Sequence, residues 1–475
     1  QYTTSDSYAV IPVSNWGNSY TVLSMPNDAY GFASDTAGIP PSEIRQSEFL
    51  VMAAEDNTDV DLVLTAASEG GIPAGVTRRV VLQKGQCYLV KSAPIAPKKG
   101  DLTGSFVRAN KPIAVVSGHA RTSVPQGLVS SVDSKDHLAE WLMPDQTLGP
   151  EYITTPFYTD ARIPAGDIIR IVAVQPSTRV SVYTERQDYA FTLNNPGDVQ
   201  TISGVTSPAW IRADKAVTVG QYMLTGSVGG SSGYDPSLTI IAPADKFITR
   251  SVFQAPFNLG EPAFATQFQK HFLNLVCDSM ARTSIRLDGV NISKSIAPEI
   301  LTSKFRSSPF FWAVIPITPG KHELSCDTGF FSGTLYGMGY TDSYAHTLGF
   351  ATITGKSDTI APSFTVSNTC GTLSGTVRET INAVSTGIAS VVIDGDSTKN
   401  YEFLATRVPG DINTVTWTAK PTDPYKDGQI FVVTRDKAGN GRVFRWYYRA
   451  PRFTQTSSIL FSAKTENDSL CQRLY

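Results

Sequence analysis

A motif built around proline, glycine and tyrosine begins two long segments of the chain. Residues 12–20 and 144–152 both read Pro-x3-apolar-Gly-x2-Tyr. A third segment keeps Pro243 and an apolar residue four positions later, Phe247, but it lacks the glycine and the tyrosine. Recurrence of one motif at long intervals indicates a structural unit that is repeated along the chain.

Two further motifs follow each start, always in the same order. The first has an apolar run, a polar turn and a run whose apolar residues are two apart, which is typical of a β-hairpin with one buried face. This hairpin motif occurs at 49–62, 169–182 and 272–287, and a closing apolar run follows at 109–116, 213–219 and 331–338. We therefore predict three β-sandwich-like repeats, at 8–130, 131–238 and 239–350, which pack into one body because their connections are short and apolar.

The composition favours strands and turns over helices. Hydrophobic residues make up 41% of the 475 residues, enough for several buried cores. Charged residues make up 17%, against about 25% in a usual globular protein. Their place is taken by Ser, Thr, Gly, Pro and Asn, which are residues of turns and strand edges, while the helix formers Lys, Glu and Leu are scarce. We expect an all-β protein of several domains.

The sequence changes character at the polar stretch 355–362. Residues 358–450 resemble a bacterial immunoglobulin-like domain, which implies a β-sandwich with Trp417 and Trp446 as core aromatics. The residues that carry the resemblance are 358–362, 387–388, 400–401, 427–428 and the turn 436–440. Within that turn, Gly439-Asn440 supplies the positive φ that a tight hairpin requires.

The last residues, 452–475, are too few to bury a core of their own. They read as a strand, a polar turn and the start of a second strand, and they resemble the opening of a tandem β-module of bacterial surface proteins. We expect either a further β-domain that continues beyond Tyr475 or a tail that docks elsewhere, and we favour the continuation.

Charge and hydropathy exclude two classes of partner. The net charge is −2 and the pI is near 6.3, whereas nucleic-acid binding requires a basic field, so no nucleic-acid partner is expected. No run of 18 apolar residues exists, so no membrane-spanning segment is predicted. The chain begins at Gln1 without methionine, which fits a mature N-terminus left by a signal peptidase, and the expected location is extracellular or at the cell surface.

The cysteines are odd in number and none lies in a CxxC motif, so at least one is a free thiol or pairs outside this chain. Cys277 and Cys326 lie in apolar strands of the third repeat, and we predict a disulfide between them. A bond between Cys370 and Cys471 is the alternative to an unpaired C-terminal cysteine, and Cys87 is predicted to be a buried free thiol.

One stretch of the chain contains the residue types of a hydrolase site. These residues are Ser117, His119, Asp133, Asp136, His137 and Glu140. However, the serine is not in the GxSxG elbow that exposes a nucleophile. We favour a structural role, in which these groups cap a loop or a short helix around 134–142. No catalytic residue, cofactor or enzyme activity is predicted.

No metal site is predicted, because the histidines share no metal-ligand spacing. Asp56, Asp59 and Asp61 alternate along a strand but lack the glycine and terminal glutamate of an EF-hand, and we interpret them as its solvated face. Aromatic residues at 152–158 and 310–312 are dense enough for a glycan platform, yet a buried sandwich edge is favoured for them.

Residues 8–345 resemble the N-terminal domain of the IgGFc-binding protein family, which occurs in animal mucus proteins and bacterial surface proteins. The resemblance is carried by 12–20, 56–58, 85–86, 101–105, 111–115, 117–119 and 136–140. It implies an extracellular, non-catalytic β-module in a long surface protein, and the immunoglobulin-like domain implies a bacterial source. Animal members carry cysteines beside several of these motifs, whereas Lys135 precedes Asp136 here, so their disulfides are not carried over.

Two functions follow as hypotheses. The first is a non-catalytic structural or adhesive protein of a bacterial cell surface, a subunit of a surface layer or filament, whose partners are other copies of itself or other surface proteins. The second is a receptor-like module that binds a glycan or a host protein. Ordered polymers on purification would favour the first function, and saturable binding on a glycan array would favour the second.

Overall fold

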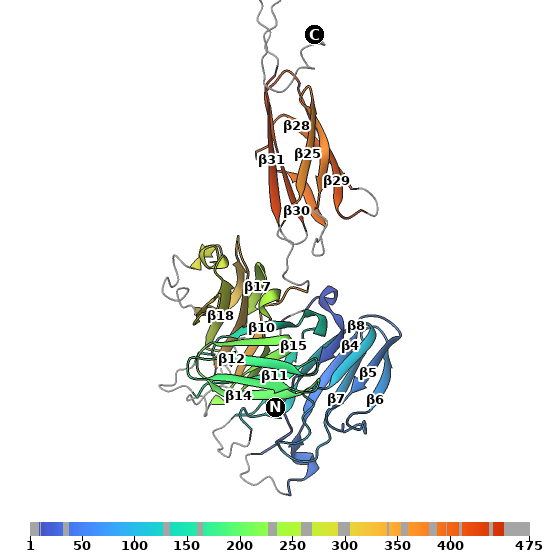
Figure 1. Ribbon diagram of the computed structural model, residues 1–475, viewed down its shortest axis with the longest axis vertical. Helices are drawn as coiled ribbons and strands as arrows, with labels where there is room; N and C mark the ends of the chain where they lie inside the picture. Colours follow the sequence, from blue (N-terminus) through green and yellow to red (C-terminus); the bar gives the residue numbers. More distant parts are fainter. Residues whose placement is uncertain are drawn as a thin grey trace, which may run out of the picture. The chain divides into compact units, whose positions relative to one another are not determined.

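The chain divides into two compact units, Gln1–Ile353 and Thr354–Tyr475. Antiparallel strands build both units, which confirms the all-β prediction (Figure 1). Five 3-10 helices lie between the described strands: η1 (Val13–Asn15), η2 (Pro41–Glu43), η3 (Asp145–Thr147), η4 (Ala244–Lys246) and η5 (Ala281–Thr283). The computed structural model describes residues 9, 11–31, 38–126, 134–158, 165–226, 235–257, 268–292, 305–339, 342–352, 360–379, 387–395, 397–407, 411–436 and 440–450.

The first sheet of the larger unit has the strand order β6-β5-β8-β4-β7. Strand β8 is 17 residues long, so it pairs with β1 and β5 along its first half and with β4 and β9 along its second half. A two-stranded ribbon, β2 (Asp28–Ala29) with β3 (Ile44–Arg45), accompanies this sheet. The sheet's strands are β1 (Gly17–Thr21), β4 (Ser47–Ala53), β5 (Thr58–Val63), β6 (Thr77–Leu82), β7 (Cys87–Lys91), β8 (Phe106–Thr122) and β9 (Asp136–Trp141).

The second sheet repeats this topology strand for strand. Its order is β13-β12-β15-β11-β14, and β10 and β16 pair with the long strand β15 as β1 and β9 pair with β8. Its strands are β10 (Gly149–Thr154), β11 (Asp167–Ala173), β12 (Thr178–Tyr183), β13 (Asp188–Leu193), β14 (Val199–Val205), β15 (Ala209–Met223) and β16 (Ser237–Ile240).

In the third repeat the long strand is broken in two. Strand β22 pairs with β17 and β19, and β23 pairs with β18 and β24, so the single sheet becomes two sheets, β17-β22-β19-β20 and β21-β18-β23-β24. The strands are β17 (Arg250–Ala255), β18 (Lys270–Asp278), β19 (Arg286–Leu287), β20 (Val290–Asn291), β21 (Phe310–Ile317), β22 (Gly320–Ser325), β23 (Phe331–Gly339) and β24 (Asp342–Thr347).

The tyrosine of the recurring motif fastens the first strand of a repeat to its long strand. The Tyr20 hydroxyl accepts a hydrogen bond from the Gly17 N–H (2.9 Å) and donates one to the Ile113 carbonyl (2.7 Å). Tyr152 makes the equivalent two contacts in the second repeat. Both side chains are fully buried, so the hydroxyl satisfies two backbone groups that water does not reach.

The glycine of the motif is required by the repeat that follows. A Cβ atom on Gly17 would lie 2.5 Å from Cβ of Pro144, the first residue of the second motif, and a Cβ on Gly149 would lie 2.8 Å from Cβ of Pro243. In the third repeat Ile248 stands in place of the glycine, and no described part of the chain packs there as a fourth repeat. The glycine is therefore present in the two repeats against which another repeat packs.

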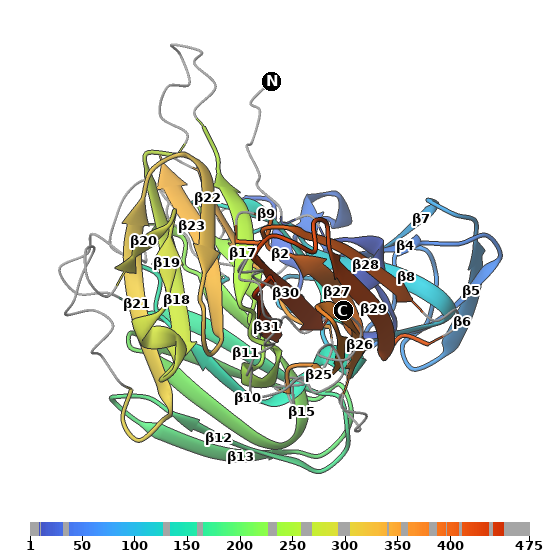
Figure 2. The same ribbon diagram turned by 90° about the horizontal axis from the view of Figure 1, so that it is seen from above.

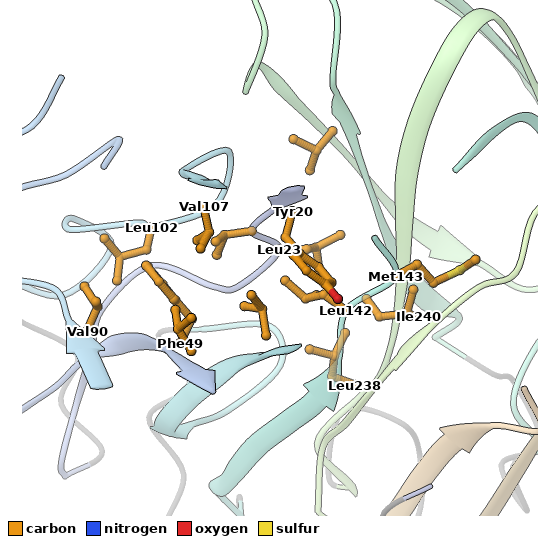
Figure 3. Packing of buried hydrophobic residues seen from close by; sticks show 14 of the residues in the cluster. Tyr20, Leu23, Phe49, Val90, Leu102, Val107, Leu142, Met143, Leu238 and Ile240 are labelled. Carbon is orange, nitrogen blue, oxygen red and sulfur yellow. The ribbon is translucent and has the colours of Figure 1, made fainter. Parts of the chain in front are cut away.

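The hydrophobic cores join the repeats into one unit. The largest core contains Phe49 of β4 and Leu138 of β9 together with Leu238 and Ile240 of β16, as Figure 3 shows in part. Separate cores fill the second and third repeats. Seen from above, β4 and β8, β11 and β15, and β18 and β23 succeed one another around the unit (Figure 2). The closing strands β9, β16 and β24 lie next to one another in that order.

The smaller unit contains two sheets, β25-β26-β29-β28 and β27-β30-β31, around one core. Trp417 is fully buried in that core and the half-buried Trp446 packs against it, as predicted for both. The hairpin after β30 is held by Asn440, whose N–H donates to Asp436 Oδ1 (2.8 Å). The strands are β25 (Ser363–Thr369), β26 (Thr372–Arg378), β27 (Ile388–Ile393), β28 (Tyr401–Arg407), β29 (Thr414–Pro421), β30 (Gly428–Asp436) and β31 (Gly441–Tyr448). The predicted tail, 452–475, lies outside the described residues.

Candidate binding surface

The pairing of β8 with β9 brings together the residues that resemble a hydrolase site. Ser117 lies opposite Glu140, and His119 lies opposite Leu138. The Ser117 hydroxyl is buried and donates to the Leu23 carbonyl (2.9 Å). Asp133 lies outside the described residues. The predicted short helix around 134–142 is wrong, because buried and half-buried residues alternate from 136 to 141 and form strand β9.

His119 is an internal structural residue. Its Nδ1 accepts the Arg121 N–H (3.1 Å), and its Nε2 therefore donates to the Pro26 carbonyl (2.8 Å). The ring is fully buried, and loss of solvation lowers its pKa to about 4, so it is neutral above that pH. Both ring nitrogens are occupied by backbone groups, which leaves no nitrogen to serve as a base.

Glu140 is also buried, where the closing strands of the three repeats meet. The Trp141 N–H donates to Glu140 Oε1 (2.9 Å). Burial raises the pKa of the carboxyl group to about 8, while the hydrogen bond from the Trp141 N–H acts in the opposite direction. The group is therefore mainly protonated at neutral pH and holds strands together without carrying charge.

A buried ion pair fixes the ribbon of β2 and β3. Lys135 Nζ lies 3.2 Å from Asp28 Oδ2 and also donates to the Ala29 (2.7 Å) and Gly31 (3.0 Å) carbonyls. The Thr122 hydroxyl donates to the same Asp28 oxygen (3.0 Å). These contacts tie the loop after β2 to the end of β8 and the start of β9.

Tyr30, in this tied loop, presents two arginines at the surface. Its ring is 52% exposed. The guanidinium carbons of Arg45 and Arg121 lie 4.4 and 5.2 Å from the ring centroid, within cation–π range. The Arg121 side chain donates to the Tyr30 carbonyl (2.8 Å), and Arg45 donates to the Ser42 and Ile44 carbonyls (3.1 and 3.2 Å). We call these three residues the Tyr30 platform.

The Tyr30 platform concentrates positive charge. Among the described residues, neither Arg45 nor Arg121 forms an ion pair. Burial raises the pKa of the nearby Asp235 carboxyl group to about 6, and the charge of Arg121 offsets only part of that rise. A guanidinium has five N–H donors, and the contacts above use only part of them. Guanidinium groups recognise carboxylate, sulfate and phosphate through paired hydrogen bonds. The platform has the chemistry of an anion-binding surface.

A model of the family described as IgGFc binding protein matches residues 6–337, most of the chain. The chain belongs to the IgGFc-binding protein family. A comparison with curated proteins finds no match. None of the helices in the described residues is long and apolar enough to cross a lipid bilayer.

Other candidates in the IgGFc-binding region are occupied by structural contacts. Asp61 pairs with Arg79 (2.7 Å), and Asp56 Oδ1 accepts the Lys84 N–H (2.9 Å). No cluster of His, Cys, Asp and Glu in the described residues could hold a metal ion. Of the aromatic candidates at 152–158 and 310–312, only Tyr158 is largely exposed.

The predicted disulfide of the IgGFc-binding region is absent from the structure, where Cys277 and Cys326 are free thiols. Cys277 faces the core from β18, whereas the Cys326 thiol follows β22 and donates to the Gly329 carbonyl (3.3 Å). The prediction of a buried Cys87 is also wrong, because Cys87 begins the edge strand β7 and is exposed. In the smaller unit Cys370 is disulfide-bonded, and its predicted partner, Cys471, lies outside the described residues.

The Tyr30 platform was not predicted from the sequence. Its members lie far apart in the sequence, on three different segments, and only the fold brings them together. The one available signal was Ser117-Gly118-His119: this motif ends two residues before Arg121, and its histidine holds the Arg121 backbone. The motif therefore positions Arg121 of the Tyr30 platform from the interior and is not itself part of the platform.

Proposed function

We propose that this IgGFc-binding family member is a non-catalytic, extracellular binding module that recognises an acidic glycan at the Tyr30 platform. The observation that carries the proposal is the pair of guanidinium groups, Arg45 and Arg121, held against one exposed ring without an acidic partner in the described residues. Two positive charges held near one ring favour a negative charge beside them, so a bound anion would be attracted to both.

The chemistry of the platform suits a sugar acid. A carboxylate or sulfate group accepts paired hydrogen bonds from a guanidinium, and the sugar ring adds hydroxyl groups for further donors. The platform lies at the surface on a ribbon fixed from below by the Lys135–Asp28 pair, so its donors are positioned before the ligand arrives. Preorganisation of this kind is typical of a binding site.

The non-catalytic part of the proposal rests on the groups beneath the platform. His119 is neutral with both nitrogens bound to backbone, and Glu140 is buried between strands. Neither side chain is placed to exchange a proton with a ligand at Tyr30. Membership of a binding family agrees with this interpretation.

The extracellular, bacterial surface setting is part of the same proposal. It is supported by the resemblance of residues 358–450 to bacterial immunoglobulin-like domains and by the two-sheet architecture of the smaller unit. We keep 8–130, 131–238 and 239–350 as the proposed repeats, and we count β9, which lies in the second range but pairs with β8, with the sheet of the first repeat.

A glycan array probed with the full chain tests the proposed function. We expect saturable binding to acidic glycans and no binding to their neutral counterparts. Tyr30→Ala removes the ring that holds both arginines and should abolish the signal, whereas Tyr30→Phe keeps the ring and should preserve it. Binding confined to neutral glycans, or unchanged binding by Tyr30→Ala, would contradict the proposal.

A further inference from the structure

The first repeat covers one face of the second repeat's sheet. This face, called here the outer face, lies opposite the sheet's own core. In the second repeat it carries Arg170 on β11 and Tyr222 on β15. The Tyr222 hydroxyl donates to the Ser24 carbonyl of the first repeat (2.8 Å), and Arg170 donates to the same carbonyl and to Asp101 (2.7 Å). The covering segment is the one that follows strand β1.

The second repeat covers the outer face of the third repeat in the same way. Asn274 on β18 donates to the Thr155 (3.1 Å) and Pro156 (3.0 Å) carbonyls, which follow strand β10. Next to this contact, Tyr158 stacks on Phe272 with 4.8 Å between ring centroids. Each covering segment therefore occupies the same place in its own repeat, and the three repeats stack in one direction.

Among the described residues, no repeat covers the outer face of the first repeat. Leu89, Leu50, Val116 and Trp141 lie opposite one another on the neighbouring strands β7, β4, β8 and β9 and form an apolar row. Leu89 is 51% exposed, and the other three are half-buried. Burial alternates along β4, whereas every residue of the equivalent strand β11 is buried. Trp16 touches only the end of this row, 6.3 Å from Trp141.

The covering segment of the third repeat is exposed and apolar. Counted from the proline that begins each repeat, Val252 stands where Ile153 stands in the second repeat, and Phe257 stands where Tyr158 stands. Ile153 packs into a cluster with third-repeat residues, including Phe310, and Tyr158 contacts the third repeat as described above. Val252 is 49% exposed and Phe257 is 56% exposed. Positions that make the internal contact in the second repeat thus remain apolar in the third repeat, where no described repeat packs against them.

We propose that a second copy of this chain docks its third-repeat covering segment on the first-repeat outer face, head to tail. The contact continues the internal stacking of the repeats from one molecule to the next. Because the two surfaces differ, each added copy leaves one of each surface unoccupied, so the assembly grows as an open chain. Ile248 stands where Gly17 and Gly149 stand in the other two repeats, and its side chain fills the space that the proline of a following repeat would need. At this point we therefore expect the two copies to lie further apart than two repeats of one chain.

Sedimentation velocity of the full chain over a range of concentrations tests this inference with two variants. Leu89→Asp removes the apolar row, Phe257→Asp removes the covering surface, and both positions are exposed, so neither change should unfold the protein. We expect the native chain to form a series of oligomers and each variant to remain monomeric. An equimolar mixture should form dimers and nothing larger, because each variant contributes one intact surface. Leu404→Asp, at an exposed leucine of the smaller unit, should assemble like the native chain.

Three results would overturn the inference. One is a native chain that stays monomeric at every concentration. Another is loss of assembly in Leu89→Asp but not in Phe257→Asp, which indicates a symmetric contact between two first-repeat faces. The third is a mixture of the two variants that forms no dimer. Thermal unfolding of both variants, expected to match the native chain, separates these outcomes from misfolding.

Discussion

Arg170 and Asp101, 69 residues apart in the sequence, form an ion pair of 2.7 Å that ties the second repeat to the first. The guanidinium is almost fully buried, and it also bonds Thr103 (2.8 Å) and the Ser24 carbonyl. Desolvation lowers the pKa of Arg170, but Asp101 and Tyr222 together more than offset it, so the pKa of Arg170 is raised. The ion pair therefore links the two repeats from within and is not an exposed surface salt bridge.

Arg170→Ala should lower the free energy of unfolding by about 3–5 kcal/mol, because removal of one partner leaves polar groups unpaired between two repeats. Arg179→Ala is the matched control: its pair with Asp214 is largely exposed, and its loss should leave stability nearly unchanged. Chemical denaturation of both variants measures the difference. Equal stability of the two variants would show that the repeats are held together by apolar contacts alone.

Gly17→Ala should destabilise the larger unit by about 1–3 kcal/mol, because the added methyl group meets the rigid ring of Pro144. Gly31→Ala adds the same group where no atom lies within 4 Å and should be tolerated. Thermal unfolding of the two variants decides whether the repeat junction is as tight as the distances imply.

Glu140→Gln should change the pH dependence of stability. The folded-state pKa of Glu140 is about 8, above its ordinary value of 4.5, so its contribution is fully present below about pH 4.5 and is lost as the pH rises through 8. Glutamine does not ionise, and the variant's stability relative to the native chain should therefore rise across this window. At about 1.36 kcal/mol per pH unit, the rise is on the order of 5 kcal/mol.

Denaturation at several pH values measures the effect of Glu140→Gln. Glu55→Gln, at an exposed carboxyl group, is the control and should show no such trend. A difference that is flat from pH 4 to 9 would mean that Glu140 is ionised in the folded protein.

Cys87 should be the one described thiol that reacts rapidly with a disulfide reagent in the native protein, since it is exposed on an edge strand. Burial raises the pKa of Cys277 and of Cys326 to about 12, so both stay protonated and slow. Unfolding without reductant should then release these two as further thiols. If they do not appear, Cys277 and Cys326 are joined after all.

The repeated architecture was predictable because its signals are local. Pro144, for example, begins a motif whose residues contact groups close to them in the sequence or in the next repeat. The alternation of apolar residues along β8 and β15 is also visible in the sequence. The broken strand of the third repeat was visible only as a fading motif. Strand β9 was missed because Asp136 and Glu140 look like surface residues, whereas strands of other repeats bury them.

The candidate site could not be predicted, because its residues become neighbours only through long-range packing. Nothing in the sequence around Tyr30 indicates that Arg45 and Arg121 reach its ring. Likewise, the environment of Lys135 depends on Asp28, more than a hundred residues away. Motif residues such as His119 stand out in the sequence, yet they are buried and only position the residues of the surface.

Calorimetric titration with the acidic oligosaccharide that gives the strongest array signal tests the central claim, recognition of an anion by Arg45 and Arg121, most directly. Each charged hydrogen bond is worth about 1.5–3 kcal/mol, so Arg45→Gln and Arg121→Gln should each weaken binding roughly tenfold or more. The double variant should not bind, and Arg78→Gln, at an exposed arginine of β6, should bind like the native chain. Native affinity in the double variant, with its fold intact, would contradict the account.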